Sequence, residues 1–236
     1  MNLLDLLKAA KREMGVSGPV PTTAQSLTGE MLRVRDWLID SNREICAEKS
    51  NWKFLRSRFT VDTVIGTEAY LPEDCTDTKL SAVMTEDGFS RWITEKYDTF
   101  RIYLTSAGAS TQQRFWPRDY ESFRFLYQLQ PPANGQPVYY AIRDDDLAIL
   151  LAPKPNDVYT VTGEYYRRAP DLDADADIPL FPERFHMAIV WRAVRKYAQY
   201  EEDGGVYAAA NIDYKRIHGP LLKDQLPRLR LGGPLA

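Results

Sequence analysis

Val158-Tyr-Thr-Val-Thr-Gly-Glu-Tyr-Tyr166 is the stretch that decides how this chain folds. Its residues alternate, so that Val161, Gly163 and Tyr165 share one face, and a period of two predicts a β-strand. Between residues 182 and 203, apolar residues instead recur at spacings of three and four: Phe185, Ile189, Val190, Ala193, Val194 and Tyr197. That period predicts a helix with one apolar face. The chain therefore passes from a β part to an α part at this point.

The composition is that of a soluble globular protein with a high share of aromatic residues. The 236 residues suffice for one large domain or two small ones, and 44% hydrophobic and 27% charged residues are ordinary values. The 14 Tyr and 5 Trp exceed what a core usually needs, and both residue types suit interfaces because they join an apolar body to a polar tip. The formal net charge of −3 argues against a general nucleic-acid binder, whose field is usually basic.

Cysteine use and hydropathy indicate a protein made in the cytosol. Cys46 and Cys75 give neither a disulfide framework nor a metal-binding spacing, so we expect two reduced thiols. The segment from Met1 to Lys8 mixes acidic and basic residues and has no cleavage site, which predicts no signal peptide. No apolar run approaches the roughly 18 residues of a membrane span.

Helical periodicity marks both ends of the chain. The predicted helices cover residues 2–14, 28–49, 182–203 and 206–217. Asn2 and Thr28 are expected as N-caps, and Gly15 as the end of the first helix. Gly219-Pro220 should end or kink the last helix, and the tail from Leu221 to Ala236 should form no regular element. We expect this tail to be disordered alone and to order on a partner.

The region between these helices predicts six or more strands. Alternation and turn residues predict two strand pairs, 59–64 with 69–72 and 79–84 with 89–93. Two more strands are predicted at 138–142 and 147–151, around Arg143-Asp-Asp-Asp146. The strand from Val158 closes the β part. Thr94 to Pro132 holds many aromatic residues without a clean period and gives no prediction, except an exposed loop at Gly108 to Gln112.

The predicted fold class is α+β. The N- and C-terminal helices should pack as one helical bundle, with an inserted antiparallel β domain and an extended C-terminal tail. The expected boundaries are 1–50 for the N-terminal helices, 51–170 for the β-rich insertion, 171–222 for the C-terminal helices and 223–236 for the tail.

The sequence carries no motif of an enzyme or of a cofactor site. It lacks the glycine-rich loops of nucleotide-binding proteins and the G-x-S-x-G turn of hydrolases. His186 and His218 are the only histidines, which is too few for a zinc site, and we expect His186 to be structural. Asp173 to Asp177 fails as a calcium loop because Ile178 and Arg184 stand where Gly and Glu are required. We therefore predict no catalytic residue, no cofactor and no metal.

Several short segments follow one another in a fixed order along most of the chain. They are Leu4 to Gly15, Asn51-Trp52 ahead of Phe59-Thr-Val61, Gly66-Thr-Glu-Ala-Tyr-Leu-Pro-Glu-Asp74, Asp146-Leu-Ala-Ile-Leu-Leu-Ala-Pro-Lys-Pro155, Val161-Thr-Gly-Glu-Tyr-Tyr-Arg167 and Phe181-Pro-Glu-Arg-Phe-His-Met-Ala-Ile189. In this order they resemble the head-to-tail adaptor (connector) proteins of tailed bacteriophages, which bind beneath the portal. The likeness is loose from Thr94 to Pro132.

The resemblance implies a structural virion protein of the neck, made in the host cytoplasm. It implies a ring of about twelve copies under the portal, which joins head to tail and continues the DNA channel. The implied partners are the portal protein, a downstream tail or nozzle protein, and genomic DNA that passes without sequence-specific binding. A modest negative charge suits such a channel, because a strongly basic lumen would hold the DNA.

The resemblance also implies a C-terminal tail that reaches into the portal. We expect four residues to make the portal contacts: Leu226, Arg228, Leu229 and Arg230. The leucines would act by burial and the arginines by pairing with carboxylates.

Two other functions remain open at this point. The first is another neck or tail component, such as a head-completion or tail-tube protein, which would oligomerise on itself or bind a tail protein. The second is a peptidoglycan hydrolase, because a chain with 33 Asp and Glu residues offers carboxylate pairs without singling out any of them.

Overall fold

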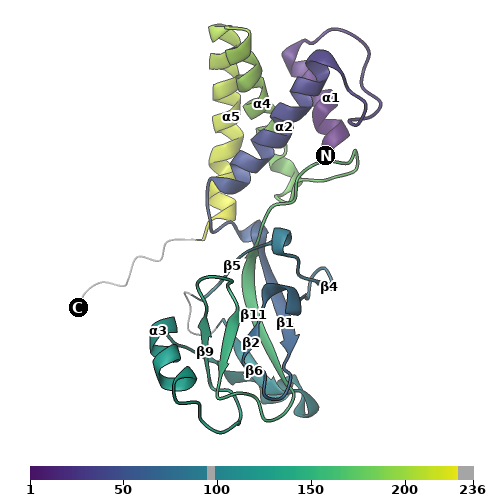
Figure 1. Ribbon diagram of the computed structural model, residues 1–236. Coiled ribbons are helices and arrows are strands. Elements are labelled where there is room, and N and C mark those ends of the chain that lie inside the picture. Colours follow the sequence, from purple (N-terminus) through teal and green to yellow (C-terminus); the bar gives the residue numbers. More distant parts are fainter. Residues whose placement is uncertain (95–98, 228–236) are drawn as a thin grey trace, which may run out of the picture. The chain divides into compact units, whose positions relative to one another are not determined.

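The computed structural model describes residues 1–94 and 99–227 and shows an α+β protein with helices at both ends and a β region between them (Figure 1). The chain divides into two compact units. The helical unit comprises Met1–Leu55 and the chain from Ala169 onward, and the β unit comprises Arg56–Arg168. The predicted α+β class, with a β region between N- and C-terminal helices, is confirmed.

In the helical unit, α4 lies at the centre of four helices. These are α1 (Leu3–Met14), α2 (Gly29–Ala47), α4 (Met187–Tyr200) and α5 (Gly204–Gln225). α4 packs against each of the other three. Its buried residues recur at the predicted spacing: Ala188, Ile189, Val190, Ala193, Val194 and Ala198. Three of these residues are alanines, whose small side chains let the neighbouring helices approach closely.

The first helix begins and ends at the capping residues expected from the sequence. The side chain of Asn2 accepts a 2.8 Å hydrogen bond from the Asp5 backbone nitrogen, so α1 begins with the expected cap. Gly15 ends α1 in the left-handed conformation, with a φ of 68°, as expected. Thr28 is the N-cap residue of α2, as expected, but its side chain makes no capping hydrogen bond.

The predicted end of the last helix is also wrong. α5 continues through Gly219-Pro220 to Gln225, so residues that were expected to start an irregular tail are helical. Proline inside a helix removes one backbone donor and crowds the carbonyl four residues earlier, so another contact must offset its cost. The buried stripe of α5 continues on the far side of this proline, because Leu221 is fully buried one turn after His218. Packing of that residue outweighs the local preference to stop.

The β unit contains two sheets. Sheet A has seven strands: β1 (Arg56–Asp62), β3 (Thr76–Asp77), β4 (Ala82–Val83), β5 (Phe89–Trp92), β6 (Arg101–Leu104), β7 (Gln113–Arg114) and β11 (Tyr159–Arg167). Sheet B has four: β2 (Ala69–Tyr70), β8 (Trp116–Pro117), β9 (Tyr139–Ile142) and β10 (Ile149–Ala152). The described pairs are antiparallel except β8 with β9. The strand predicted from Val158 is β11, and it pairs with β1, β5 and β6.

Both predicted strand pairs are wrong. β1 pairs with β11 and β3, whereas β2 pairs with β10 in the other sheet. The turn between β1 and β2 therefore carries the chain from one sheet to the other, and the Tyr70 hydroxyl fixes it by accepting from the Val64 nitrogen over 2.8 Å. β5 pairs with β11 and not with β4. The strands predicted at 138–142 and 147–151 are β9 and β10, and they pair with each other.

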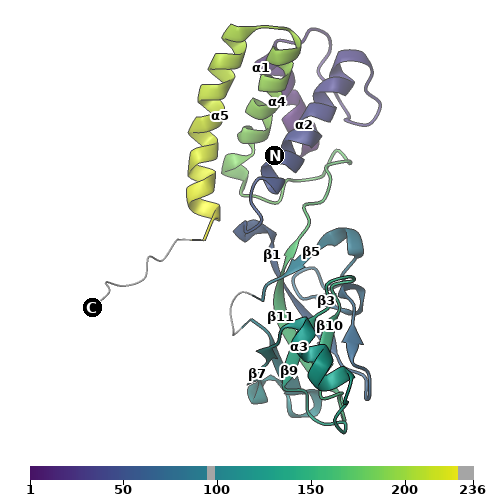
Figure 2. The same ribbon diagram turned by 60° about the vertical axis from the view of Figure 1, so that its left-hand side comes forward.

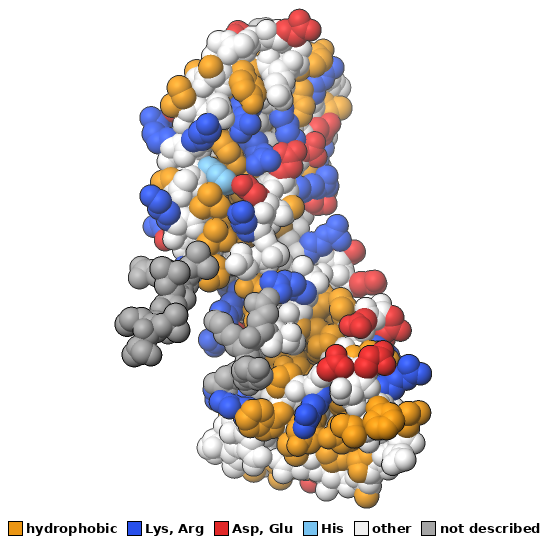
Figure 3. All heavy atoms as spheres, turned by 90° about the vertical axis from the view of Figure 1, so that its left-hand side faces the viewer, with side chains coloured by type: hydrophobic (Ala, Val, Ile, Leu, Met, Phe, Trp, Pro, Cys, Tyr) orange, Lys and Arg blue, Asp and Glu red, His pale blue; other side chains and the backbone are white. Residues whose placement is uncertain are grey.

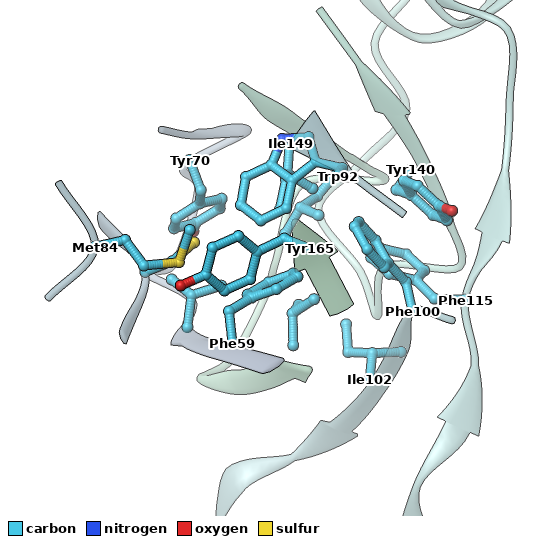
Figure 4. Packing of buried hydrophobic residues seen from close by; sticks show 14 of the residues in the cluster. Phe59, Tyr70, Met84, Trp92, Phe100, Ile102, Phe115, Tyr140, Ile149 and Tyr165 are labelled. Atoms are coloured by element: carbon cyan, nitrogen blue, oxygen red, sulfur yellow. The ribbon is translucent and has the colours of Figure 1, made fainter. Parts of the chain in front are cut away.

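An aromatic core fills the space between the two sheets. Figure 4 shows Phe59 and Tyr165 from sheet A close to Trp92, and Tyr140 from sheet B beside Phe100 and Phe115. Phe100 stacks on Tyr140 with ring centroids 4.5 Å apart. The region from Thr94 to Pro132, which has no clear periodicity in the sequence, thus supplies part of this core.

A short helix forms a third layer on sheet B. α3 (Tyr120–Phe123) continues through a π-helical turn (Arg124–Gln128), and Figure 2 shows it lying across β9 and β10. Phe123 is fully buried against Ala141 and Leu150, which face away from the aromatic core. The β unit is therefore a stack of sheet A, sheet B and α3.

Candidate interaction surfaces

One of the four predicted portal contacts lies within the described residues, at the end of α5. Leu226 is the half-buried residue that follows the helix, and its backbone nitrogen bonds the Leu222 carbonyl over 3.1 Å. The other three predicted contacts, Arg228, Leu229 and Arg230, lie outside the described residues.

Ionic contacts hold the end of α5 to the helical unit. A guanidinium nitrogen of Arg184 lies 2.7 Å from a carboxylate oxygen of Asp224. Lys53 donates a 2.7 Å hydrogen bond to the backbone oxygen of the same residue. The chain beyond the helix therefore starts from a fixed position.

Both histidines are buried in the helical unit. His186 lies with Nε2 2.8 Å from the Phe181 carbonyl and Nδ1 3.1 Å from the Met1 carbonyl, which agrees with the structural role predicted for it. His218 stacks on Tyr214, and its Nε2 lies 2.9 Å from a carboxylate oxygen of Glu48. Burial lowers the pKa of each imidazole, so each favours the neutral form.

A polar network joins three helices of this unit. Arg192 of α4 donates a 2.6 Å hydrogen bond to Glu44 of α2 and a 2.9 Å hydrogen bond to the Tyr214 hydroxyl of α5. Lys196 lies 2.9 Å from the same glutamate. Burial raises the pKa of Glu44, but hydrogen bonds from the two cations outweigh it, and the net pKa is lowered. The network fixes the helices rather than forming an open site.

The outer face of sheet A concentrates positive charge. Five arginines occupy facing positions on its strands: Arg56, Arg58, Arg91, Arg101 and Arg114. Residues directly opposite one another on paired strands point to the same side of a sheet. Among the described residues, the acids at these positions are Asp62 and Glu164, and Arg91, Arg101 and Arg114 have further partners. We call this surface the arginine face.

The arginine face is hollowed rather than flat. A groove of about 720 Å³ is lined by the following residues: Arg56, Arg58, Phe59, Thr78, Thr99, Arg101, Gln112, Thr162, Gly163 and Glu164. Glu164 forms an ion pair with Arg56 and lies 3.8 Å from Arg58, whose side chain is 77% exposed. One carboxylate is thus shared by two guanidinium groups on this surface.

An acidic hollow lies elsewhere on the β unit. It has a volume of about 360 Å³ and is lined by Leu71, Pro72, Glu73, Glu86, Phe89, Asp145, Asp146 and Leu147. These residues come from the segments after β2 and before β5 and from the β9–β10 turn. Asp146 is held by Arg143, whose hydrogen bonds lower its pKa to about 2. We call this hollow the acidic pocket.

The outward side of the α3 segment is apolar. Phe125, Leu126 and Leu129 have exposed fractions of 69%, 49% and 66%. Figure 3 shows hydrophobic side chains gathered over the β unit on the face seen there, with acidic side chains close by. Apolar patches of this kind mark contact surfaces in soluble proteins.

Comparison with known proteins identifies the family. The SU10 adaptor protein family model matches residues 1–226, and so spans both units. The chain belongs to the SU10 adaptor protein family. This confirms the resemblance to phage head-to-tail adaptors. No curated protein matches the chain.

The SU10 adaptor family consists of structural phage proteins rather than enzymes. Within residues 1–94 and 99–227, no group of three or more His, Cys, Asp or Glu side chains could hold a metal ion. Cys46 and Cys75 are both buried and free, and burial raises the pKa of each thiol to about 12. None of the described helices of this adaptor is long and apolar enough to cross a membrane.

Sequence reasoning missed the two charged surfaces of the adaptor. Arg56 and Arg58 stand two apart on a strand, which was a visible signal for one side of a sheet. The other arginines join them only through the pairing of β5, β6 and β7, which no local pattern revealed. The acidic pocket likewise assembles from three separate segments.

Proposed function

We propose that this chain is a head-to-tail adaptor that forms a ring of about twelve copies under the portal, joins head to tail and continues the DNA channel. The observation that carries the proposal is the family match across residues 1–226. A modest net charge of −3 supports passage of DNA, because a strongly basic lumen would retain the phosphate backbone.

In this proposal the portal is bound by the C-terminal tail, through Leu226, Arg228, Leu229 and Arg230. The ionic contacts of Asp224 support it, since they fix the point from which the tail departs. Leucines in a segment that orders on its partner add buried area, and arginines add bidentate pairing with carboxylates.

Native mass spectrometry of the chain, alone and mixed with its own portal ring, tests the function. We expect a monomer alone and a fixed, ring-closing number of copies on the portal. A chain that ignores the portal, or that builds a tube by itself, would overturn the proposal in favour of another neck or tail component. Clearing of peptidoglycan that is lost when one of two carboxylates becomes an amide would point to a hydrolase.

A truncation tests the tail separately. Removal of residues 228–236 leaves α5 and Leu226 in place, so the monomer should fold while its affinity for the portal falls at least tenfold. The double variant Arg12→Ala/Arg216→Ala is the control, because it removes two arginines from exposed positions of the helical unit. Equal portal binding by the truncated chain and by wild type would refute the tail assignment.

A further inference from the structure

We propose that the outer face of α5 in one copy packs against the outer face of α2 in the next copy of the ring. The inference rests on the proposed ring and names the two surfaces that close it. A cyclic ring needs two different surfaces on each subunit, because every copy meets its two neighbours through different sides. Both surfaces belong to the helical unit.

The outer face of α5 is the side of this helix that points away from α4. Ala210 and Tyr214 are buried, and Ile212 lies two positions from each of them. Two positions correspond to about 200° around an α-helix, so Ile212 points to the opposite side, where it is 68% exposed. Ala208, one turn earlier on the same side, is also exposed and is small enough to let another helix approach closely. This side of α5 is therefore an apolar helix face that is exposed in the single chain.

The outer face of α2 points away from the core of the helical unit. Val34 and Leu38 are buried, and Asp36 lies two positions from each, so its side chain points outward and is 58% exposed. Leu32, one turn before Asp36 on the same side, is 38% exposed. The ion pair between Asp36 and Arg35 is long, at 4.0 Å, so the carboxylate can accept a closer cation. This face therefore joins an apolar side chain to an available acid.

α2 and α5 flank α4 from opposite sides, as Figure 2 shows. Tyr197 of α4 contacts Trp37 of α2, with ring centroids 6.1 Å apart. Arg195 of α4 instead faces α5, where it donates a 3.3 Å hydrogen bond to the Tyr207 hydroxyl. Tyr197 and Arg195 are two positions apart, and so they lie about 200° apart around α4. Because each outer face points away from the core, one copy can offer one face to each of its two neighbours.

The charges beside the two apolar positions have opposite signs. On α5, Lys215 follows Ile212 one turn later, is exposed, and forms no ion pair with any residue that the structure describes. On α2, Asp36 follows Leu32 one turn later. Packing of Ile212 beside Leu32, with the two helices running in the same direction, therefore brings Lys215 close to Asp36. Complementary charge of this kind fixes the register and orientation of an interface.

A second copy fits the outer face of α5 better than DNA does. A phosphate backbone would bond Lys215, but it would leave Ile212 without an apolar partner. The outer face of α2 offers both an apolar side chain and a carboxylate. It is also present once in every copy, so the two faces occur in equal number in any closed ring.

Cysteine cross-linking tests the contact with the full chain and its portal ring. Both substituted positions of the double variant Leu32→Cys/Ile212→Cys are exposed, so this variant should fold. A disulfide needs Cα atoms within about 7 Å of each other, so oxidation on the portal should link neighbouring copies into a series of covalent multimers. Cys46 and Cys75 are buried, and oxidised wild type serves as the background. Denaturing electrophoresis without reductant measures the multimers.

The single cysteine variants show which faces meet. Leu32→Cys alone and Ile212→Cys alone should each stay uncross-linked, because the two faces of a ring contact are different. A cross-linked dimer from Ile212→Cys alone would mean that two α5 faces meet, and it would overturn the inference. Rings of the double variant without covalent multimers would overturn it as well.

Charge exchange tests the pairing of Lys215 with Asp36. Lys215→Glu alone and Asp36→Lys alone should each close about tenfold fewer rings on the portal than wild type, measured by native mass spectrometry. The combined variant Lys215→Glu/Asp36→Lys should restore closed rings, because both partners are then reversed at every contact. Lys8→Glu, at an exposed position of α1, is the control and should close rings normally.

The outcomes separate failure of the inference from failure of the proposed function. If wild type closes no rings on the portal, the proposed function fails, and the inference fails with it. Normal rings from both single charge variants, or no restoration in the combined variant, would overturn the inference alone. Loss of binding of even one copy of Lys215→Glu to the portal would assign the outer face of α5 to the portal instead.

Discussion

The Tyr165 hydroxyl donates a 2.5 Å hydrogen bond to the carboxylate of Asp77, inside the β unit. Ser57 donates a second bond to the same oxygen over 2.8 Å, and the Lys79 and Leu80 backbone nitrogens bond the other oxygen. Asp77 itself is 1% exposed. This buried carboxylate therefore ties β1, β11 and the turn after β3 together, since no water can replace its donors.

Asp77 should make the β unit sensitive to acid. Burial raises its pKa, but the hydrogen bonds from Tyr165, Leu80, Ser57 and Lys79 outweigh burial and lower the net value below 3.8. A folded pKa below the unfolded one gives stability that is complete above about pH 4 and is lost as the pH falls through the folded value. Asp77→Asn should lower the free energy of unfolding by about 1–3 kcal/mol at pH 7. In this variant the free energy of unfolding should also fall less steeply as the pH is lowered. Urea unfolding at several pH values measures both effects.

The matched control for that experiment is Asp87→Asn, at an exposed position. It should change the free energy of unfolding by less than about 0.5 kcal/mol. If the free energy of unfolding falls as steeply at low pH in Asp77→Asn as in wild type, other carboxylates govern acid unfolding.

Gly163 should tolerate no side chain. A Cβ atom at this position would lie 2.5 Å from a ring carbon of Phe100 and 2.6 Å from one of Phe59. Both rings are buried in the aromatic core and cannot move aside, so Gly163→Ala should destabilise the protein by about 1–3 kcal/mol. Thermal unfolding followed by near-ultraviolet circular dichroism reports on this core.

Gly219→Ala is the contrasting variant, because a Cβ atom there meets nothing within 4 Å. Its position inside α5 predicts a gain of about 0.5–1 kcal/mol. Gly163→Ala and Gly219→Ala proteins of equal stability would contradict the packing described for both sites.

The Arg192 network should stabilise the helical unit. Arg192→Ala removes the donor of the Tyr214 hydroxyl and one of the two cations that bond Glu44, the other being Lys196. We expect a loss of about 1–2 kcal/mol in the free energy of unfolding, limited by partial exposure of the carboxylate. The stability of Arg192→Lys should lie between those of wild type and Arg192→Ala, because one ammonium group cannot reproduce the planar, forked donor geometry of a guanidinium. Chemical denaturation measures the series. The Arg216 side chain is 73% exposed, so Arg216→Ala should change the free energy of unfolding little. An equal loss of stability in Arg216→Ala and Arg192→Ala would show that the network does not specifically stabilise the helical unit.

Two phenylalanines of the α3 segment should respond in opposite ways. Phe123 is fully buried against sheet B, so Phe123→Ala should cost about 3–5 kcal/mol. Phe125 is 69% exposed, so Phe125→Ala should change the free energy of unfolding by less than about 0.5 kcal/mol. Urea unfolding of both variants checks the orientation of this helix, and a large loss in Phe125→Ala would mean that the segment is turned over.

Local patterns predicted the elements of this fold better than their pairing. The stripe of α4 and the alternation of β11 were readable because each spans more than two of its own periods. The pairing of β1 with β11 joins residues such as Phe59 and Gly163, which lie far apart in the sequence, and no local rule specifies that choice. The turn between β1 and β2 looked like a hairpin turn because both kinds of turn use the same residues.

The region from Thr94 to Pro132 shows where periodicity stops being informative. β7 and β8 contain two residues each, which is a single period of a strand. Their aromatic neighbours, among them Phe100 and Phe115, are placed by contacts with Tyr140 rather than by regular spacing. The arginine face was hidden for the same reason, because three of its five members lie on β5, β6 and β7.

The register of β1 with β11 sets Arg56 opposite Tyr166, so the β unit starts and finishes on neighbouring strands. Adjacent antiparallel strands lie about 5 Å apart, which is a gap that a very short peptide can bridge. The β unit is thus an insertion whose first and last strands are neighbours in one sheet. Two recombination crossovers between related phage genomes, one at each end of the β unit, would exchange the whole unit. The surface of the β unit would then change while the sequence of the helical unit stays the same.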